Sequence, residues 1–583
     1  MKYPTLKVLP TSRELLDVFK GYNHNLRIDS GEFYEMENLS SDDFPILAPR
    51  KKRGVYASPG IPQGMIAKDK LCYVDGSDIV LKDGDKEERV HLGLTVDDNP
   101  KKMVSMGAYV IVMPDKKYVN TKNLSDNGSI EEFYESTAEA SFTLCKMDGV
   151  AYEKVAAQDT APPDPKNMEL WIDTSSTPHT LKQYSETSSA WFAIATTYIK
   201  ISSPGIGMKF SEGEGVTISG VKDEALADLN ASCAILAKGD DYIVVKGILD
   251  KVTTQTESIK VERKMPNMDF IIESGNRLWG CHYGKALNGE FVNEIYASKL
   301  GDFKNWNCFQ GISTDSYAAT VGTDGPFTGA VTHLGYPLFF KENCLHKVYG
   351  NYPANFQIQT TTLRGVQSGC DRSLSILNEV LYYKSRSGVC AYDGSLPVEI
   401  SSALGNVSYH NAAAGALGNK YYISMADEYE AYHLFVYDTM KGMWHREDGT
   451  QAIDFCAYRG DLYFIDYASK QIKSVKGNGA VDVKPIQWFA ISGVIGTDSP
   501  DKKYISRMDV RMKLEVGTRV SFYAEYDSSG YYEYIFTMTG KNIESFSVPI
   551  RPRRCDHLRL RIVGTGEAKI FSICKTIEWG SSQ

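Results

Sequence analysis

The chain has 583 residues, of which 11% are aromatic, and its formal net charge is -9. This length predicts several domains unless a repeat architecture absorbs it. The acidic balance argues against a protein that coats nucleic acid over a broad face, and it leaves room for a local basic patch. No apolar stretch reaches the roughly 18 residues of a membrane span, and the first residues lack the apolar core of a secretory signal. We therefore expect a soluble protein that is made in a cytoplasm.

The first segment, residues 1–63, is predicted to be an arm without a core of its own. It contains scattered aromatic residues, few long apolar runs and the basic run "RKKR" at residues 50–53. The stretch "SRELLDVF" from Ser12 is one of two credible short helices in the whole sequence. The other is "KDEALADLNASCAIL" from Lys222.

A hairpin-like unit then recurs along much of the chain. Its first runs include "GYPLFF", "NEVLYY", "GNKYYI" and "GDLYFI", which begin at Gly335, Asn378, Gly418 and Gly460. Each is followed by a polar turn and a second run, at a period close to the roughly 40–50 residues of a four-stranded propeller blade. Similar units begin at Lys70, Gly107 and Gly275. The pattern predicts an all-β protein with a β-propeller of about seven blade-like units, in a first part over residues 64–156 and a main part over 265–484.

Two further β domains are predicted outside the repeat. The period is broken over residues 157–264, where the Pro-rich stretch "APPDPKN" from Ala161 is followed by alternating runs, so we expect an inserted small β domain there. After residue 484 the repeat stops. Runs such as "RVSFYAEYD" from Arg519 alternate with a period of two and predict a β-sandwich over residues 485–583.

Three stretches resemble proteins of tailed bacteriophages. The segment "FKGYNHNLRIDSGEFYEMENLSSDDFPILAPRKKRGVY" from Phe19 resembles the start of virion proteins in which an arm precedes a propeller. Residues 275–306, "GNRLWGCHYGKALNGEFVNEIYASKLGDFKNW", resemble a signature of packaged-DNA stabilisation and tail-nozzle proteins. The stretch "MELWIDTSSTPHTLKQYSETSSAWFA" from Met168 is similar to a small module of tail and fibre proteins. The resemblance covers the arm and the propeller, about two thirds of the chain.

No set of residues in the sequence predicts catalysis, a cofactor or a metal site. The stretch "SKLGDFKNW" from Ser298 is a near miss to the Asp-box of sialidases, and acids such as Glu294, Asp393 and Asp438 fall at strand ends, where Asp more often bonds its own backbone. No nucleophile elbow, zinc-binding helix or phosphate loop is present. Eleven scattered cysteines without a C-x-x-C pair favour buried thiols over disulfides or metal ligands.

Two basic clusters are candidate contacts with a neighbouring subunit or with DNA. They are Arg50, Lys51, Lys52 and Arg53 in the arm, and Arg551, Arg553, Arg554, Arg559 and Arg561 near the end. The alternative is a solvated face. Alternation places Arg559 and Arg561 on one side of their strand, opposite Leu558 and Leu560. We expect the arm to lie extended against the propeller, a neighbouring subunit or an adjoining virion ring, and substitution of residues 50–53 by Ser to weaken assembly without changing the melting temperature. The alternative is a leader strand that completes the last blade.

The resemblance implies a structural protein of a tailed-phage virion rather than an enzyme. We expect a nozzle or head-tail adaptor ring of identical subunits, six in number, around the DNA exit path, located in the virion tail. Such a ring retains the packaged genome and passes it on, and its partners are neighbouring tail or portal-adaptor proteins, tail fibres and the transient genome DNA. An acidic lumen would let DNA slide. The alternative functions are a tail-tip receptor-binding or fibre-attachment protein and, third, a glycan-degrading propeller enzyme.

Overall fold

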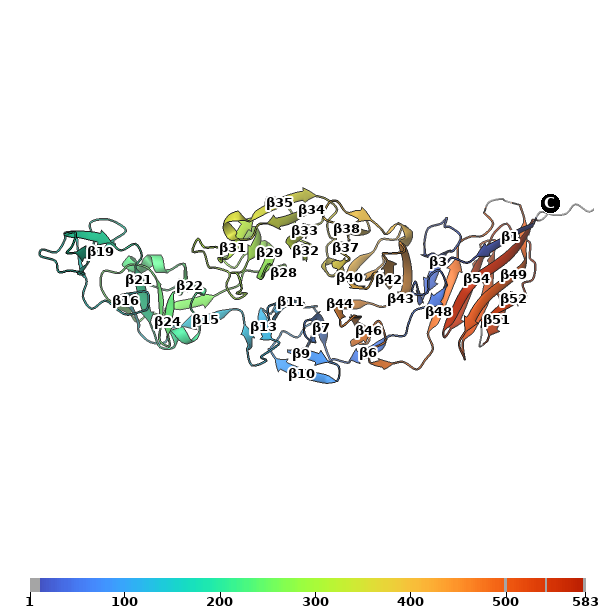
Figure 1. The fold of residues 1–583 in the computed structure, drawn as a ribbon, viewed down its shortest axis with the longest axis horizontal. Coiled ribbons are helices and arrows are strands. Elements are labelled where there is room, and N and C mark those ends of the chain that lie inside the picture. Colours follow the sequence, from blue (N-terminus) through green and yellow to red (C-terminus); the bar gives the residue numbers. More distant parts are fainter. Residues whose placement is uncertain (1–10, 498–500, 541–542, 580–583) are drawn as a thin grey trace, which may run out of the picture.

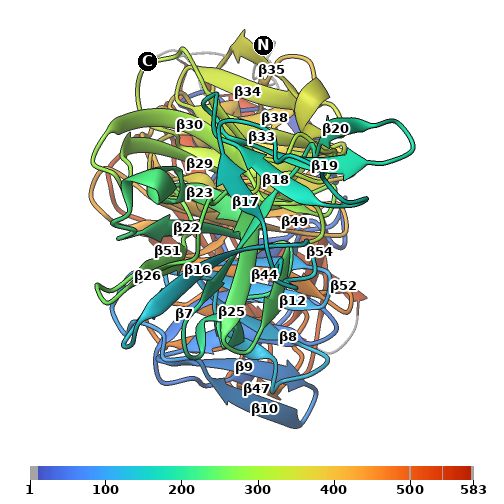
Figure 2. The ribbon, with the colours of Figure 1, turned by 90° about the vertical axis from the view of Figure 1, so that its left-hand side faces the viewer.

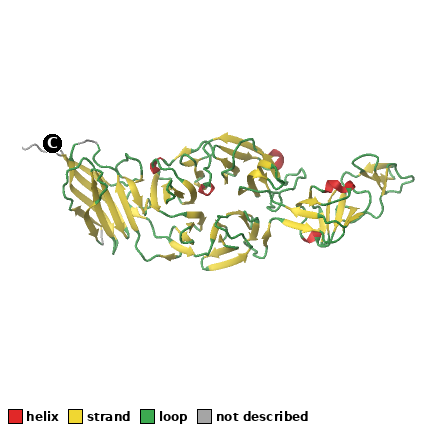
Figure 3. Cartoon of the chain, turned by 180° about the vertical axis from the view of Figure 1, so that it is seen from behind, coloured by secondary structure: helices red, strands yellow, loops and turns green. Residues whose placement is uncertain are grey.

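The computed structural model describes residues 11–497, 501–540 and 543–579. Three β-rich bodies lie in a row, with a propeller between an inserted domain at one end and a β-sandwich at the other (Figure 1). Within the described residues the helices are short 3-10 turns (Figure 3). These are η1 (Ile206–Met208), η2 (Glu224–Leu229), η3 (Pro353–Asn355), η4 (Asp371–Ser373) and η5 (Ser402–Leu404). The predicted all-β class is confirmed.

Seven four-stranded antiparallel blades form the propeller, as many as the hairpin units predicted from the sequence. Blade one holds β7 (Pro62–Ala67), β8 (Leu71–Asp75), β9 (Asp78–Asp83) and β10 (Lys86–His91). Blade two holds β11 (Lys102–Met106), β12 (Tyr109–Met113), β13 (Lys117–Asn120) and β14 (Asn127–Ser129). Blade three holds β28 (Phe270–Ser274), β29 (Arg277–Lys285), β30 (Phe291–Ala297) and β31 (Tyr317–Thr320).

The next three blades follow without interruption. Blade four holds β32 (Gly329–His333), β33 (Tyr336–Lys341), β34 (Cys344–Tyr349) and β35 (Gln357–Thr362). Blade five holds β36 (Ser375–Leu377), β37 (Val380–Lys384), β38 (Val389–Tyr392) and β39 (Val398–Glu399). Blade six holds β40 (His410–Leu417), β41 (Lys420–Ala426), β42 (Tyr432–Asp438) and β43 (Met443–Asp448).

The hairpins visible in the sequence are the second and third strands of each blade. Their second strands are apolar on both faces, as β33 and β41 are, because each is packed between the neighbouring blades. Gly335, Gly418 and Gly460 have positive φ angles and make the tight turn into this strand. These turns and runs are local in sequence, which is why the repeat was readable.

The inner strands close the ring. Strand β7 contacts β11, β11 contacts β28, and β28 contacts β32. The turn η4 bridges β32 to β40, and β40 contacts β44 (Ala452–Tyr458), which in turn contacts β7. The seven blades thus surround one axis.

The arm completes blade seven. This blade holds β44, β45 (Asp461–Asp466) and β46 (Gln471–Ser474), and its fourth strand is β6 (Gly54–Ala57) from the arm. Beyond β6 the short strand β47 (Ala480–Val481) adds a fifth strand at the edge. Gly54 fits because a Cβ there would lie 2.2 Å from the Asn478 carbonyl oxygen. The leader-strand alternative is therefore the observed one.

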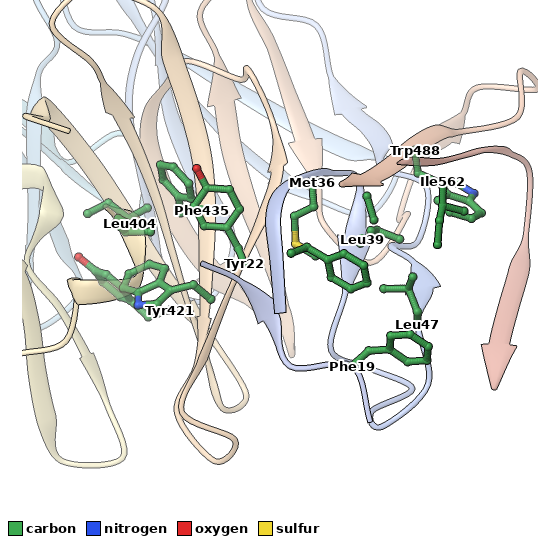
Figure 4. Close-up of a cluster of buried hydrophobic side chains, with 14 of the residues drawn as sticks. Phe19, Tyr22, Met36, Leu39, Leu47, Leu404, Tyr421, Phe435, Trp488 and Ile562 are labelled. Carbon is green, nitrogen blue, oxygen red and sulfur yellow. The ribbon is translucent and has the colours of Figure 1, made fainter. Parts of the chain in front are cut away.

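The arm also joins the propeller to the sandwich through one ten-stranded sheet. Beyond β43 of blade six come β2 (Gly21–Tyr22) and β3 (Glu32–Glu37), and then the sandwich strands β48 (Gln487–Ser492), β53 (Leu558–Thr565), β50 (Arg519–Tyr526) and β51 (Glu533–Thr539). One hydrophobic cluster follows the sheet, from Phe435 and Tyr22 through Met36 to Trp488 (Figure 4). The two bodies therefore share backbone hydrogen bonds and a core.

The second sandwich sheet contains the first described strand of the chain. Its order is β1 (Thr11–Leu16), β54 (Ala568–Trp579), β49 (Lys503–Leu514) and β52 (Ile543–Val548). The helix predicted from Ser12 is wrong, because this segment pairs over its whole length with β54. The arm contains one more pair of strands, β4 (Leu39–Ser40) and β5 (Ala48–Pro49).

The inserted domain contains three sheets and lies at the far end of the row, in front of the propeller in Figure 2. One sheet holds β15 (Glu132–Glu135), β27 (Lys260–Arg263), β22 (Gly215–Ser219) and β23 (Ser232–Ala234). The second holds β24 (Ala237–Gly239), β25 (Tyr242–Lys246), β21 (Tyr198–Ser202), β16 (Ala140–Cys145) and β26 (Thr253–Gln255). The third holds β17 (Ala156–Gln158), β18 (Leu170–Asp173), β19 (Thr180–Ser185) and β20 (Ala190–Ala193).

The insertion begins earlier than the predicted boundary at residue 157. Strands β15 and β16, which were assigned to the first propeller part, pair with β27 and β21 of the insertion. At its root the two connecting segments lie together, since the Arg263 Nε donates to the Ile130 carbonyl oxygen at 2.8 Å. The physical domain therefore spans residues 132–263, and its Pro-rich stretch lies inside it. The helix predicted from Lys222 is reduced to the 3-10 turn η2.

This boundary predicts the outcome of two deletions. Residues 132–263 can be replaced by Asn-Gly, because Glu132 and Arg263 are cross-strand neighbours and a two-residue turn connects such a pair. We expect a monodisperse propeller-sandwich protein with a cooperative melting transition. Deletion of residues 157–264 leaves β15 and β16 without their partners and should give aggregated protein. Size-exclusion chromatography and circular dichroism compare the two, and equal behaviour would contradict the revised boundary.

Candidate functional site

The propeller axis is occupied by an arginine. Arg372, on the turn η4, donates hydrogen bonds to the carbonyl oxygens of Ile453 and Lys101, both at 3.1 Å. These acceptors lie in blade seven and just before blade two, so the side chain spans the centre of the ring. Cavities of about 270 and 480 Å³ are both lined by Arg372.

Four acids line these cavities, namely Asp97, Asp98, Asp269 and Asp371, and two of them have structural contacts. Asp269 faces the His282 Nδ1 at 2.9 Å and accepts the Tyr283 backbone N–H at 2.8 Å. Asp97 is bonded by the Asn99 side chain, which lowers the pKa of its carboxyl. A general acid for glycoside cleavage needs a raised pKa and a second carboxylate at about 5–10 Å. Asp97 has the opposite shift.

Of the acids singled out in the sequence, Asp393 and Asp438 cap turns. Glu294 instead lies inside strand β30 and accepts the Thr320 hydroxyl at 3.4 Å, so its predicted place at a strand end is wrong. Asp393 accepts the backbone N–H and hydroxyl of Ser395, and Asp438 accepts the backbone N–H groups of Met440 and Lys441. Asp302 of the near Asp-box accepts the backbone N–H of Lys304. The interpretation as turn residues is therefore confirmed for Asp302, Asp393 and Asp438.

The basic run of the arm is divided between the interior and the surface. Arg53 reaches Glu447 at 2.6 Å and Asp448 at 2.8 Å, and Arg50 reaches the same two carboxylates at 3.6 and 3.3 Å. The arginine side chains are only 10% and 13% exposed. Burial opposes the charge of Arg53, but the two carboxylates outweigh it and raise the pKa of Arg53. The carboxylates that these arginines face belong to blade six of the same chain, which corrects the expected subunit or DNA contact.

The two lysines of this run differ from the arginines and from each other. The Lys52 ammonium donates to the backbone oxygens of Asp482 and Val483 at 3.1 and 3.2 Å. Lys51 is exposed and makes no side-chain hydrogen bond or ion pair within the described residues. Whether either contacts a partner stays a prediction.

A cavity of about 350 Å³ lies beside Lys51, between the arm and blades six and seven. We call it the basic cavity. The cations that line it are Arg50, Lys51, Arg53, Lys420, Lys441 and Lys476, and the carboxylates are Asp42, Asp438 and Glu447. Behind it His445 is fully buried; burial first, and then Lys420 and Lys441, lowers its pKa to about 3.

The C-terminal arginines fall into two groups, one at the exposed surface and one packed against aromatic rings. Arg551 and Arg554 are exposed, and Arg553 forms an ion pair with Glu533. Arg559 and Arg561 alternate with buried leucines, as predicted, and lie on the outer face of β53. The Arg559 guanidinium stacks 4.5 Å from the Tyr34 ring, and that of Arg561 lies between Phe489 and Tyr532 at 5.3 and 5.6 Å.

Among the described residues, no group of three His, Cys, Asp or Glu side chains has the proximity of metal ligands. All eleven cysteines are free. Eight of them are buried, which confirms the interpretation as core thiols for those eight, whereas Cys233, Cys456 and Cys574 are half-buried. Within the residues that the structure describes, no helix has the length and apolar character needed to cross a membrane.

Comparison with known proteins identifies no family. No family model matches the sequence, and neither does any curated protein. Among solved structures, the exo-β-1,3-galactanase of Phanerochaete chrysosporium aligns at 8% identity over 52% of this chain and 94% of its own, with a TM-score of 0.20. The extracellular domain of a putative one component system of B. thetaiotaomicron aligns at 8% identity over 89% and 90%, with a TM-score of 0.22.

A third similar structure is the WD40 domain of Toxoplasma gondii coronin, at 9% identity over 74% of this chain and 86% of its own, with a TM-score of 0.21. TM-scores this low carry no argument about function. The class of the protein, an all-β propeller with an insertion and a terminal sandwich, rests on the strand pairing and on the closed ring of inner strands.

Proposed function

We propose that the chain is a structural subunit of a tailed-phage virion, placed in a nozzle or head-tail adaptor ring that surrounds the DNA exit path. The observation that carries this proposal is the ten-stranded sheet, which makes the propeller and the sandwich one body. A continuous ladder of backbone hydrogen bonds suits a part that must keep its shape while it bears load. The resemblance of the arm and of residues 275–306 to nozzle proteins points the same way.

The geometry also bears on where DNA would run. Arg372 fills the propeller axis, so a genome would pass between subunits and not through a propeller. The net charge of -9 favours a lumen that binds phosphates weakly. The inserted domain, at the end away from the sandwich, is free to contact a neighbouring ring or a fibre (Figure 1).

Particle mass tests the proposal. Native mass spectrometry and negative-stain microscopy of the purified chain, alone and with candidate portal or tail proteins of the same genome, should show a closed ring, six-fold in our expectation. A trimer would favour the fibre-attachment alternative and overturn the ring. Turnover on a panel of glycans that is lost on substitution of one axial carboxylate, such as Asp269→Asn, would overturn the structural role altogether.

A further inference from the structure

The basic cavity has more positive charge than its carboxylates neutralise. The arginine pair is balanced by Glu447 and Asp448, as described above. The Lys420 ammonium lies 2.7 Å from Asp42, and the Lys441 ammonium lies 3.2 Å from Asp438. Each of these four cations therefore has a carboxylate of its own.

Two lysines at the cavity have no such partner among the described residues. The Lys476 ammonium donates to the neutral carbonyl oxygen of Gly460 at 2.6 Å. The Lys51 ammonium has no hydrogen bond or ion pair with any described residue. Both line the same cavity, one from the arm and one from the end of blade seven. The cavity thus has two positive charges in excess, in a chain whose net charge is negative.

We propose that the basic cavity binds a terminal phosphate group, that is, a phosphate monoester in its dianionic form. Such a group carries a charge of about -1.5 to -2 at neutral pH and three acceptor oxygens, which matches the two excess ammonium groups in charge. Lysines bind phosphate as mobile point charges and donate up to three hydrogen bonds each. Arg50, on the same wall, adds a fixed guanidinium.

The shape of the site allows such a ligand to enter. Lys51 is exposed and Met440 is 72% exposed, so these residues mark the mouth, while Tyr422 is buried behind them. The volume of about 350 Å³ falls at the lower end of small-molecule sites, which span roughly 300–1,000 Å³. There is room for the phosphate and for the first atoms of what it is attached to. This inference does not depend on the proposed role in a virion.

Titration calorimetry of the full chain tests the proposal. The probes are inorganic phosphate, adenosine 5′-monophosphate and an eight-nucleotide oligothymidylate with a 5′-phosphate or a 5′-hydroxyl. We expect saturable binding of the first two and of the phosphorylated oligonucleotide, and weak binding of the 5′-hydroxyl form. Equal affinity for the monophosphate and the phosphorylated oligonucleotide identifies a free monoester as the ligand. At least about tenfold tighter binding of the oligonucleotide identifies a nucleic-acid end.

Matched variants place the ligand in the cavity. Lys51→Gln combined with Lys476→Gln should weaken phosphate binding by about tenfold or more, because it removes both ammonium groups that lack a carboxylate partner. The melting temperature should stay unchanged, because both side chains are exposed. Lys52→Gln is the control, because Lys52 is next to Lys51 in the sequence and does not line the cavity. Absence of phosphate binding up to about 10 mM, equal loss in the Lys52 variant, or equal binding of the two oligonucleotides overturns the proposal.

Discussion

Replacement of Arg53 by Ala is expected to lower the free energy of unfolding of the propeller by about 3–5 kcal/mol. The change leaves Glu447 and Asp448 with no ion pair except the longer ones to Arg50, and the Glu447 side chain is 6% exposed. A buried carboxylate that loses its partner keeps the cost of its desolvation. The Arg53 guanidinium also lies 5.0 Å from the Phe464 ring, so its loss removes packing in blade seven. Urea denaturation followed by circular dichroism measures the effect.

The adjacent lysine is the control for this substitution. Lys52→Ala removes hydrogen bonds to two backbone oxygens at the surface and should change stability by no more than about 1 kcal/mol. A protein with Arg53→Ala that unfolds like the wild type would show that the ion pairs contribute nothing. Our sequence-based expectation, that changes in residues 50–53 leave the melting temperature unaltered, is replaced by the opposite one for the arginines.

Replacement of Trp488 by Ala is expected to cost about 3–5 kcal/mol in the stability of the sandwich. The indole is 2% exposed, and its Nε1 donates to the Gly566 carbonyl oxygen at 3.0 Å. It lies against Gly564, where a Cβ would be 2.0 Å from the ring. The small-to-large change Gly564→Val should therefore destabilise the same contact from the other side.

Tyr534 supplies the comparison for the tryptophan. It is 60% exposed on β51, three strands from Trp488, so Tyr534→Ala should change stability by about 0.5 kcal/mol or less. Differential scanning calorimetry can separate a transition of the sandwich from one of the propeller. If Trp488→Ala and Tyr534→Ala melt alike, the shared core of the ten-stranded sheet is not the source of rigidity that we infer.

The blades were readable from the sequence because each is made of neighbouring segments. Runs such as those after Gly335 and Gly418 carry their own turns, and the pairing of second and third strands follows directly. The insertion boundary was misplaced because β16 has the apolar alternation of any blade strand, and only its partners, β21 and β26, assign it to the insertion. The local sequence pattern predicts that a segment is a strand. The sheet to which that strand belongs is decided by partner strands that lie far away in the sequence.

The same limit applies to the site. The run at residues 50–53 was conspicuous because its charges are contiguous. Its partners Glu447 and Asp448, and the lysines Lys420 and Lys476 across the cavity, come from separate hairpins about 400 residues away. Charged residues in hairpin turns are common, so nothing in their own neighbourhood marks them. Only the path of the arm across blades six and seven brings them together.

The position of the arm has a consequence for how the protein is made. Strand β1 pairs with β54 and strand β6 with β46, so the arm leaves the ribosome long before its partner strands are synthesised. At about 5–20 residues per second, the interval is roughly 20 to 110 s. Through that time the arm presents unpaired strand edges, which are sites of mispairing between chains. Nascent chains on one polysome would therefore compete to close each other's propellers, and weaker translation initiation, which spaces the ribosomes further apart without slowing elongation, should raise the yield of correctly closed monomers.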